Sequence, residues 1–274
     1  MYAKFWQVSL PGFLVTLLLI ACAQLTPSPQ SSQPQATQPA PQTSTLLVAA
    51  AASLQTALQE VTTLYIQAHP NSSITYNFGA SGALQQQIEQ GAPVDVFISA
   101  AVKQMEILKE EGLLEAGTHK NLLTNQLVLI IPKQTPVSLT DFKQLTQPEV
   151  KRISLGEPRS VPAGQYAVEV FKNLGILEQV QSKFVLGNNV KSVLTAVETG
   201  GVEAGIVYIT DAMGSDKVTI AARADRTLHT PIVYPIAALK GSKSLEEAKK
   251  YVEFLQSNPA KTVFEKYGFG IAKP

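Results

Sequence analysis

The sequence predicts an α/β protein with mostly parallel sheets flanked by helices. Short apolar runs alternate with stretches whose apolar residues recur at helical spacing, from residue 46 to the end of the chain. Clusters of Gly, Pro and polar residues separate these runs. Such alternation is typical of parallel α/β sheets, in which ligands bind beyond the carboxyl ends of the strands.

The first elements follow from this alternation. The apolar run LLVAA predicts a strand, and Leu54, Leu58 and Val61 then share one helix face. The run ITYNF predicts a strand before the sequence GASGAL, and Gly91 ends the helix that follows. Up to Pro132, which ends the apolar run LVLII, we expect strands at 46–50, 73–78, 94–99 and 127–131, and helices at 54–69, 82–90 and 102–110.

The remaining elements continue the pattern. Pro158 and Pro162 indicate a loop between a short strand and the next helix. We expect strands at 153–155, 183–186, 204–208 and 232–238, and helices at 163–174, 190–199, 245–256 and 259–267.

The N-terminal segment has the pattern of an export signal. Residues 1–21 carry one charge, Lys4, and an apolar run too short to span a membrane. The sequence LIAC, which ends at Cys22, resembles a bacterial lipobox, in which the cysteine is lipidated. An incidental cysteine is the alternative, but an unpaired thiol is unexpected in an exported protein. We therefore expect an extracytoplasmic protein anchored to the membrane through Cys22.

The chain after the signal has two parts. Residues 22–45 are rich in Pro, Gln, Ser and Thr and carry no charge, so they predict a disordered tether. Residues 46–274 are enough for one large or two small domains. Without Lys4, 21 basic residues balance 21 acidic residues, so we expect no nucleic-acid partner. A monomer is expected.

The starts of four predicted helices share one chemistry. The junctions AAASL, FGASGAL, GEPRSVPAGQY and GNNVKS are small, flexible or polar, and leave backbone N–H groups accessible. Several first turns directed at one point make an anion site without charged side chains. An N-cap role, worth about 1 kcal/mol, is the alternative for Ser53 or Ser81 alone. We expect Ser81 to bind the ligand and also to cap its helix.

The sequence gives little support for a catalytic serine or for a site that binds a metal cation. A tethered hydrolase with Ser53 or Ser81 as nucleophile needs a base, and we interpret His69, His119 and His229 as solvated surface residues. No G-x-S-x-G elbow and no ligand cluster for a metal cation occur. An isolated acid, Asp95, is expected to accept backbone N–H groups nearby.

Five segments carry a resemblance, in order: AAASL, GASGALQQQIEQGAPVDVFISA, GEPRSVPAGQYA, GIVYITDA and FEKYGF. Together they resemble the periplasmic molybdate-binding proteins of ABC importers. The resemblance covers 46–274 and implies a non-enzymatic protein with the type II periplasmic-binding-protein fold, whose two lobes enclose a ligand cleft. It implies lobe 1 at 46–124 plus 235–274 and lobe 2 at 125–234, joined near 124–126 and 234–235.

The same resemblance implies the site. Hydroxyls of Ser53 and Ser81, backbone N–H groups of Ala163 and Val190, and the hydroxyl of Tyr208 would hold molybdate or tungstate. No cofactor is implied, and the metal would enter as the oxyanion, not as a free cation. The partners would be an ABC permease and, through the anchor, the lipid bilayer.

A site of donors suits an anion without protons. Molybdate is fully deprotonated at neutral pH, whereas phosphate keeps a proton that would face another donor. Sulfate passes this test and must be excluded by size, so sulfate or another tetrahedral oxyanion is the alternative ligand. The lobes are expected to close by hinge motion, for transport or for presenting the anion to a sensor partner.

Overall fold

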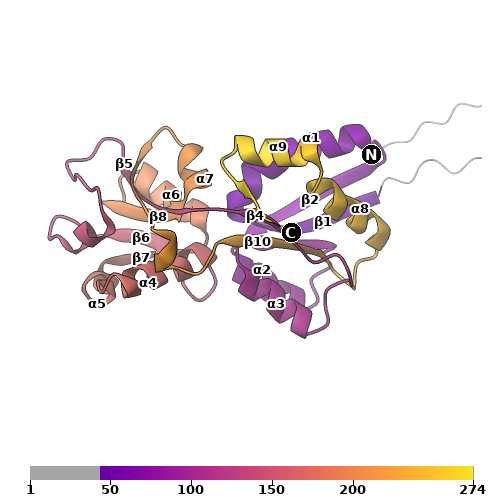
Figure 1. The fold of residues 1–274 in the computed structure, drawn as a ribbon, viewed down its shortest axis with the longest axis horizontal. Coiled ribbons are helices and arrows are strands. Elements are labelled where there is room, and N and C mark those ends of the chain that lie inside the picture. Colours follow the sequence, from indigo (N-terminus) through magenta and orange to yellow (C-terminus); the bar gives the residue numbers. More distant parts are fainter. Residues whose placement is uncertain (1–43, 274) are drawn as a thin grey trace, which may run out of the picture. The chain divides into compact units, whose positions relative to one another are not determined.

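The computed structural model describes residues 44–273, which form two sheets with helices on both faces (Figure 1). The first sheet has the order β11-β4-β10-β3-β1-β2 and the second β7-β6-β8-β5-β9. The first contains β1 (Ser44–Ala51), β2 (Ser72–Gly79), β3 (Val96–Ile98), β4 (Lys120–Thr124), β10 (Val233–Ala238) and β11 (Gly270–Ile271). The second contains β5 (Leu127–Pro132), β6 (Ile153–Gly156), β7 (Phe184–Gly187), β8 (Ala204–Tyr208) and β9 (Val218–Arg223).

We call each sheet with its helices a lobe: lobe 1 for the first, lobe 2 for the second. Lobe 1 has the 3₁₀ turn η1 (Ala52–Leu54) and helices α1 (Gln55–Ala68), α2 (Ser81–Glu89), α3 (Val102–Glu110), α8 (Leu245–Leu255) and α9 (Asn258–Lys266). Lobe 2 has helices α4 (Pro162–Asn173), α5 (Leu177–Val180), α6 (Val190–Glu198) and α7 (Ile209–Met213), and turns η2 (Phe142–Thr146), η3 (Gln181–Lys183) and η4 (Arg226–Leu228). Figure 1 shows α1, α8 and α9 on one face of the first sheet and α2 and α3 on the other.

The strand directions correct one detail of the predicted fold. The α/β class is confirmed, but the sheets are mixed rather than mostly parallel. In the first sheet β10 runs antiparallel to β3 and β4, and in the second β5 runs antiparallel to β8 and β9. Parallel neighbours need a long crossover. β5 enters the second sheet directly from β4, without such a helical connection, and β10 returns from the second sheet to the first.

Several elements are absent from the sequence-based prediction. β4 lacks an alternation of apolar and polar residues, and α7 is too short to show a helical period. β9 contains two alanines, which are depleted in strands. β1 begins at Ser44, within the predicted tether, because Ser44 and Thr45 pair with β2. Tyr234 was predicted to end lobe 2, but it pairs with Leu123 in the first sheet.

The core explains the continuous apolar runs. Every residue at 127–130 in β5 is fully buried, since helices cover both faces of its sheet.

Asp95 accepts the Leu47 N–H at 2.7 Å and the Ser242 hydroxyl at 2.6 Å, which confirms that this acid satisfies a backbone donor.

The predicted export signal, Cys22 and most of the predicted tether lie outside the described residues. The described residues belong to one compact unit. Within 44–273, none of the helices has the length and hydropathy needed to cross a membrane.

Candidate anion-binding site

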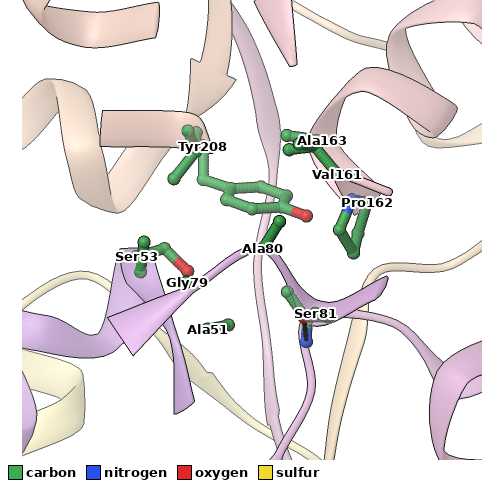
Figure 2. Close-up of a pocket in the computed structure, with 12 residues that line it drawn as sticks. Ala51, Ser53, Gly79, Ala80, Ser81, Val161, Pro162, Ala163 and Tyr208 are labelled. Atoms are coloured by element: carbon green, nitrogen blue, oxygen red, sulfur yellow. Dashed lines mark hydrogen bonds between the residues drawn. The ribbon is translucent and has the colours of Figure 1, made fainter. Parts of the chain in front are cut away.

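A small pocket lies where helix starts of the two lobes meet (Figure 2). Its cavity volume is about 10 Å³. Its lining comes from the ends of β1, β2 and β8, from η1, from the starts of α2, α4 and α6, and from Ala100 after β3. It includes all the residues expected to hold an anion: Ser53, Ser81, Ala163, Val190 and Tyr208.

The lining is uncharged. It contains no acidic, basic or histidine side chain, so hydroxyl and backbone N–H dipoles are the available anion partners. Across residues 44–273, no group of three His, Cys, Asp or Glu side chains is placed to hold a metal ion. The pocket chemistry therefore suits a small anion and offers no base for a serine nucleophile.

Ser81 opens α2 and is fully buried. Its Oγ accepts the Ala100 backbone N–H at 2.9 Å, which leaves the hydroxyl proton of Ser81 free for another acceptor. The expectation that Ser81 also caps α2 is wrong. The N-cap is Ala80, and no side chain caps this helix, because the Ser81 oxygen is directed toward Ala100 instead.

Ser53 lies in η1, between β1 and α1. Its Oγ is 2.9 Å from the Tyr234 hydroxyl, and no side chain caps either η1 or α1. Helix capping therefore accounts for neither serine of the pocket.

Tyr208 ends β8, and Figure 2 shows its ring extending across the pocket. The hydroxyl is buried and has no hydrogen-bond partner among the described residues. Burial raises the pKa of Tyr208 well above its ordinary value, so the hydroxyl is a neutral donor at physiological pH. A buried unpaired hydroxyl costs about 1–3 kcal/mol, which a ligand acceptor would recover.

Ala163 and Val190 lie in the first turns of α4 and α6, where backbone N–H groups have no intrahelical partner. Pro162 has no N–H, so Ala163 supplies the first free donor of α4. A Cβ on Gly164 would lie 1.9 Å from the Gly156 oxygen, so glycine lets α4 begin this close to β6. In α6 the Asn189 side chain accepts the Ser192 N–H and leaves that of Val190 uncapped.

The lobes touch at the edge of the pocket. The Gly82 N–H of lobe 1 donates to the Ser160 carbonyl oxygen of lobe 2 at 2.9 Å. A Cβ on Gly82 would lie 2.7 Å from that oxygen, so this approach requires glycine. Sequence reasoning missed this role, although Gly82 lies within the GASGAL motif.

Sequence reasoning also missed the polar residues behind Ser53. Asn125, Thr210 and Tyr234 form a hydrogen-bonded group there, and they lie far apart in the sequence.

The prediction that His229 is solvated is wrong: it is 8% exposed, because its ring packs near Tyr166.

Comparison with known proteins extends over most of the chain. A family described as bacterial extracellular solute-binding protein matches residues 46–270. The Bacillus subtilis protein YvgL, assigned as an ABC transporter substrate-binding lipoprotein, is 45% identical over 82% of this chain and 86% of its own. The molybdate-binding protein ModA of Haemophilus influenzae is 36% identical over 81% of this chain and 88% of its own. A solved Clostridium difficile structure, assigned as the substrate-binding domain of a molybdenum ABC transporter, is 44% identical, has a TM-score of 0.65, and matches over 84% of this chain and 99% of its own.

Proposed function

The chain belongs to the bacterial extracellular solute-binding proteins, and on that premise we propose that it captures molybdate and delivers it to an ABC importer. The observation that carries the proposal is the set of donors around one uncharged pocket: two serine hydroxyls, one tyrosine hydroxyl and two helix starts. The relatives that support molybdate are 36% and 44% identical to this chain. Members of this family bind solutes outside the cytoplasm.

The donors explain both affinity and selectivity. A hydrogen bond to a charged group contributes about 1.5–3 kcal/mol, and micromolar binding needs about 8 kcal/mol. Ser53, Ser81, Tyr208 and the N–H groups of Ala163 and Val190 are enough for that. Because they all donate, an oxyanion that keeps a proton finds no acceptor. Tungstate has nearly the size of molybdate and is expected to bind as well.

Closure of the lobes follows from where the donors lie. Ser53 and Ser81 belong to lobe 1, and Ala163, Val190 and Tyr208 to lobe 2. An anion contacts all of them only when the lobes meet, so binding favours the closed arrangement. The bond from Gly82 to Ser160 would add to it. The closed protein would then dock on the permease.

The membrane anchor is a separate part of the proposal. Lipidation of Cys22 would hold the binding domain beside the permease, with residues 23–43 as a tether. The 45% identical relative is assigned as a lipoprotein. Mass spectrometry of the protein from bacterial membranes tests this point, since an unmodified Cys22 would exclude it.

Calorimetry tests the ligand. The purified protein is titrated with molybdate, tungstate, sulfate and phosphate at neutral pH. We expect micromolar or tighter binding of molybdate and tungstate, and binding of sulfate and phosphate too weak to detect by direct titration. If sulfate binds more tightly than molybdate, the proposed anion site stands, but its ligand is sulfate. If no anion binds, the proposed function is wrong.

A further inference from the structure

We propose that Asn125 determines which oxyanions the site accepts, by setting the direction of the hydrogen bonds that reach Ser53. Asn125 does not line the pocket and acts through Tyr234, so it is a positioning residue. This inference rests on the proposed function, since it concerns how the same pocket separates unprotonated from protonated oxyanions.

The amide orientation of Asn125 is set by its neighbour. Oδ1 accepts the Gln126 backbone N–H at 2.9 Å. A flipped amide would place its NH₂ group against that N–H donor. Nδ2 therefore faces the two hydroxyls, Thr210 at 3.0 Å and Tyr234 at 3.1 Å, and it can only donate to them.

The donation from Asn125 orders the next two bonds. The Tyr234 oxygen accepts from Asn125, and its own proton is then best satisfied by the Ser53 oxygen, 2.9 Å away. If Ser53 donated to Tyr234 instead, the fully buried Tyr234 proton would have no partner within this group. The satisfied arrangement runs from Asn125 through Tyr234 to Ser53 and leaves the Ser53 proton for the pocket.

The Ser53 proton matters because of the anion it faces. A serine can donate or accept, so a bare hydroxyl would not separate molybdate from hydrogen phosphate. With its oxygen already accepting from Tyr234, Ser53 presents a donor to an unprotonated oxygen. For Ser81, the backbone N–H of Ala100 donates to the hydroxyl oxygen, so Ser81 also presents its proton to the pocket. Of the two serines, Ser53 is thus the one whose direction a side chain controls.

The variant Asn125→Asp tests this arrangement by reversing it. A carboxylate at 125 still accepts the Gln126 N–H, but it accepts from Tyr234 instead of donating to it. Tyr234 then accepts from Ser53, and Ser53 offers its oxygen to the pocket. We expect the ratio of molybdate to phosphate affinity to fall by at least about tenfold, since one charge-assisted bond is lost for molybdate and an acceptor is gained for hydrogen phosphate.

Two controls separate this effect from charge and from damage. Gln126→Glu adds the same charge one residue away, on a side chain that contacts Arg223 and not Tyr234. Molybdate and hydrogen phosphate are both dianions, so added charge weakens both, and the ratio should stay within about twofold of wild type. The double variant Asn125→Asp with Tyr234→Phe breaks the reversed path and leaves the Ser53 hydroxyl free to donate or accept, so the ratio should recover part of the way toward wild type.

Affinities come from calorimetry with molybdate and from displacement of bound molybdate by phosphate, with thermal unfolding as a check on folding. Asn125→Ala leaves the hydrogen bond between Tyr234 and Ser53 free to run in either direction, so it should lower the ratio of molybdate to phosphate affinity by less than Asn125→Asp. It replaces the Asp variant if that variant does not fold. An unchanged ratio in a folded Asp variant, or an equal change in Gln126→Glu, would overturn the inference while wild type still binds molybdate. Failure of wild type to bind molybdate would instead overturn the proposed function.

Discussion

The two sides of the pocket hold their polar groups differently. On the lobe 1 side, the oxygens of Ser53 and Ser81 already have protein partners at 2.9 Å. On the lobe 2 side, the buried hydroxyl of Tyr208 has no partner in the part of the chain that the structure describes. The oxygens of the lobe 1 serines thus have protein partners, whereas the lobe 2 tyrosine carries a donor without a partner among the described residues.

This difference indicates separate tasks for the two lobes. The serines of lobe 1 are preorganised, so little ordering is needed when an anion arrives. Tyr208 of lobe 2 gains its acceptor only with the anion present, so its contribution depends on ligand and closure together. Substitutions on the two sides should therefore affect stability and affinity in different proportions.

Gly82→Ala is expected to have the largest effect on molybdate affinity, because its added Cβ would push the two lobes apart. Its Cβ would lie 2.7 Å from the Ser160 oxygen in the closed arrangement, and such overpacking costs about 1–3 kcal/mol. We expect molybdate affinity to fall by roughly ten- to a hundredfold in calorimetry. Gly241→Ala is the matched control, since its Cβ meets nothing within 4 Å. Unchanged affinity in the Gly82 variant would show that this contact is not needed for binding.

Ser81→Ala should lower both affinity and stability. It removes one charge-assisted bond to the anion, which weakens binding by roughly tenfold or more. It also leaves the buried Ala100 N–H without its acceptor, which costs about 1–3 kcal/mol of folding free energy. Calorimetry and urea unfolding measure the two effects. Ser73→Ala, at an exposed pair with Thr45, is the control. Loss of stability without loss of affinity would restrict Ser81 to a structural role.

Tyr208→Phe should have the smallest effect on affinity and the opposite pattern in stability. Affinity should fall by about tenfold, but the unliganded protein should be as stable as wild type or about 1 kcal/mol more stable, because an unpaired buried hydroxyl is removed. The control Tyr251→Phe removes a buried hydroxyl that is paired with Tyr76, so it should lose stability and keep affinity. A Tyr208 variant that loses stability to the same extent would contradict the contrast between the two sides.

The sequence alone placed much of the fold and of the pocket. Residues 102–110 and 204–208 were predicted with the bounds that α3 and β8 have, because their apolar patterns reflect burial. The residues Ser53, Ser81, Ala163, Val190 and Tyr208 were implied by the resemblance of short motifs, at the ends of strands and starts of helices, to those of the molybdate-binding proteins. Such motifs are local in sequence, so they can be recognised without a structure, and the pocket brings these residues together.

The partners of those residues required the folded chain. Tyr234 is 181 residues from Ser53, and Asn125 is 109 residues from Tyr234, so no local pattern could pair them. The acceptor role of Ser81 toward Ala100 replaced a helix cap that was chemically reasonable from the sequence. Whether a hydroxyl caps, donates or accepts depends on which groups surround it after packing. That is why motifs located the site, and the three-dimensional contacts assigned the direction of its hydrogen bonds.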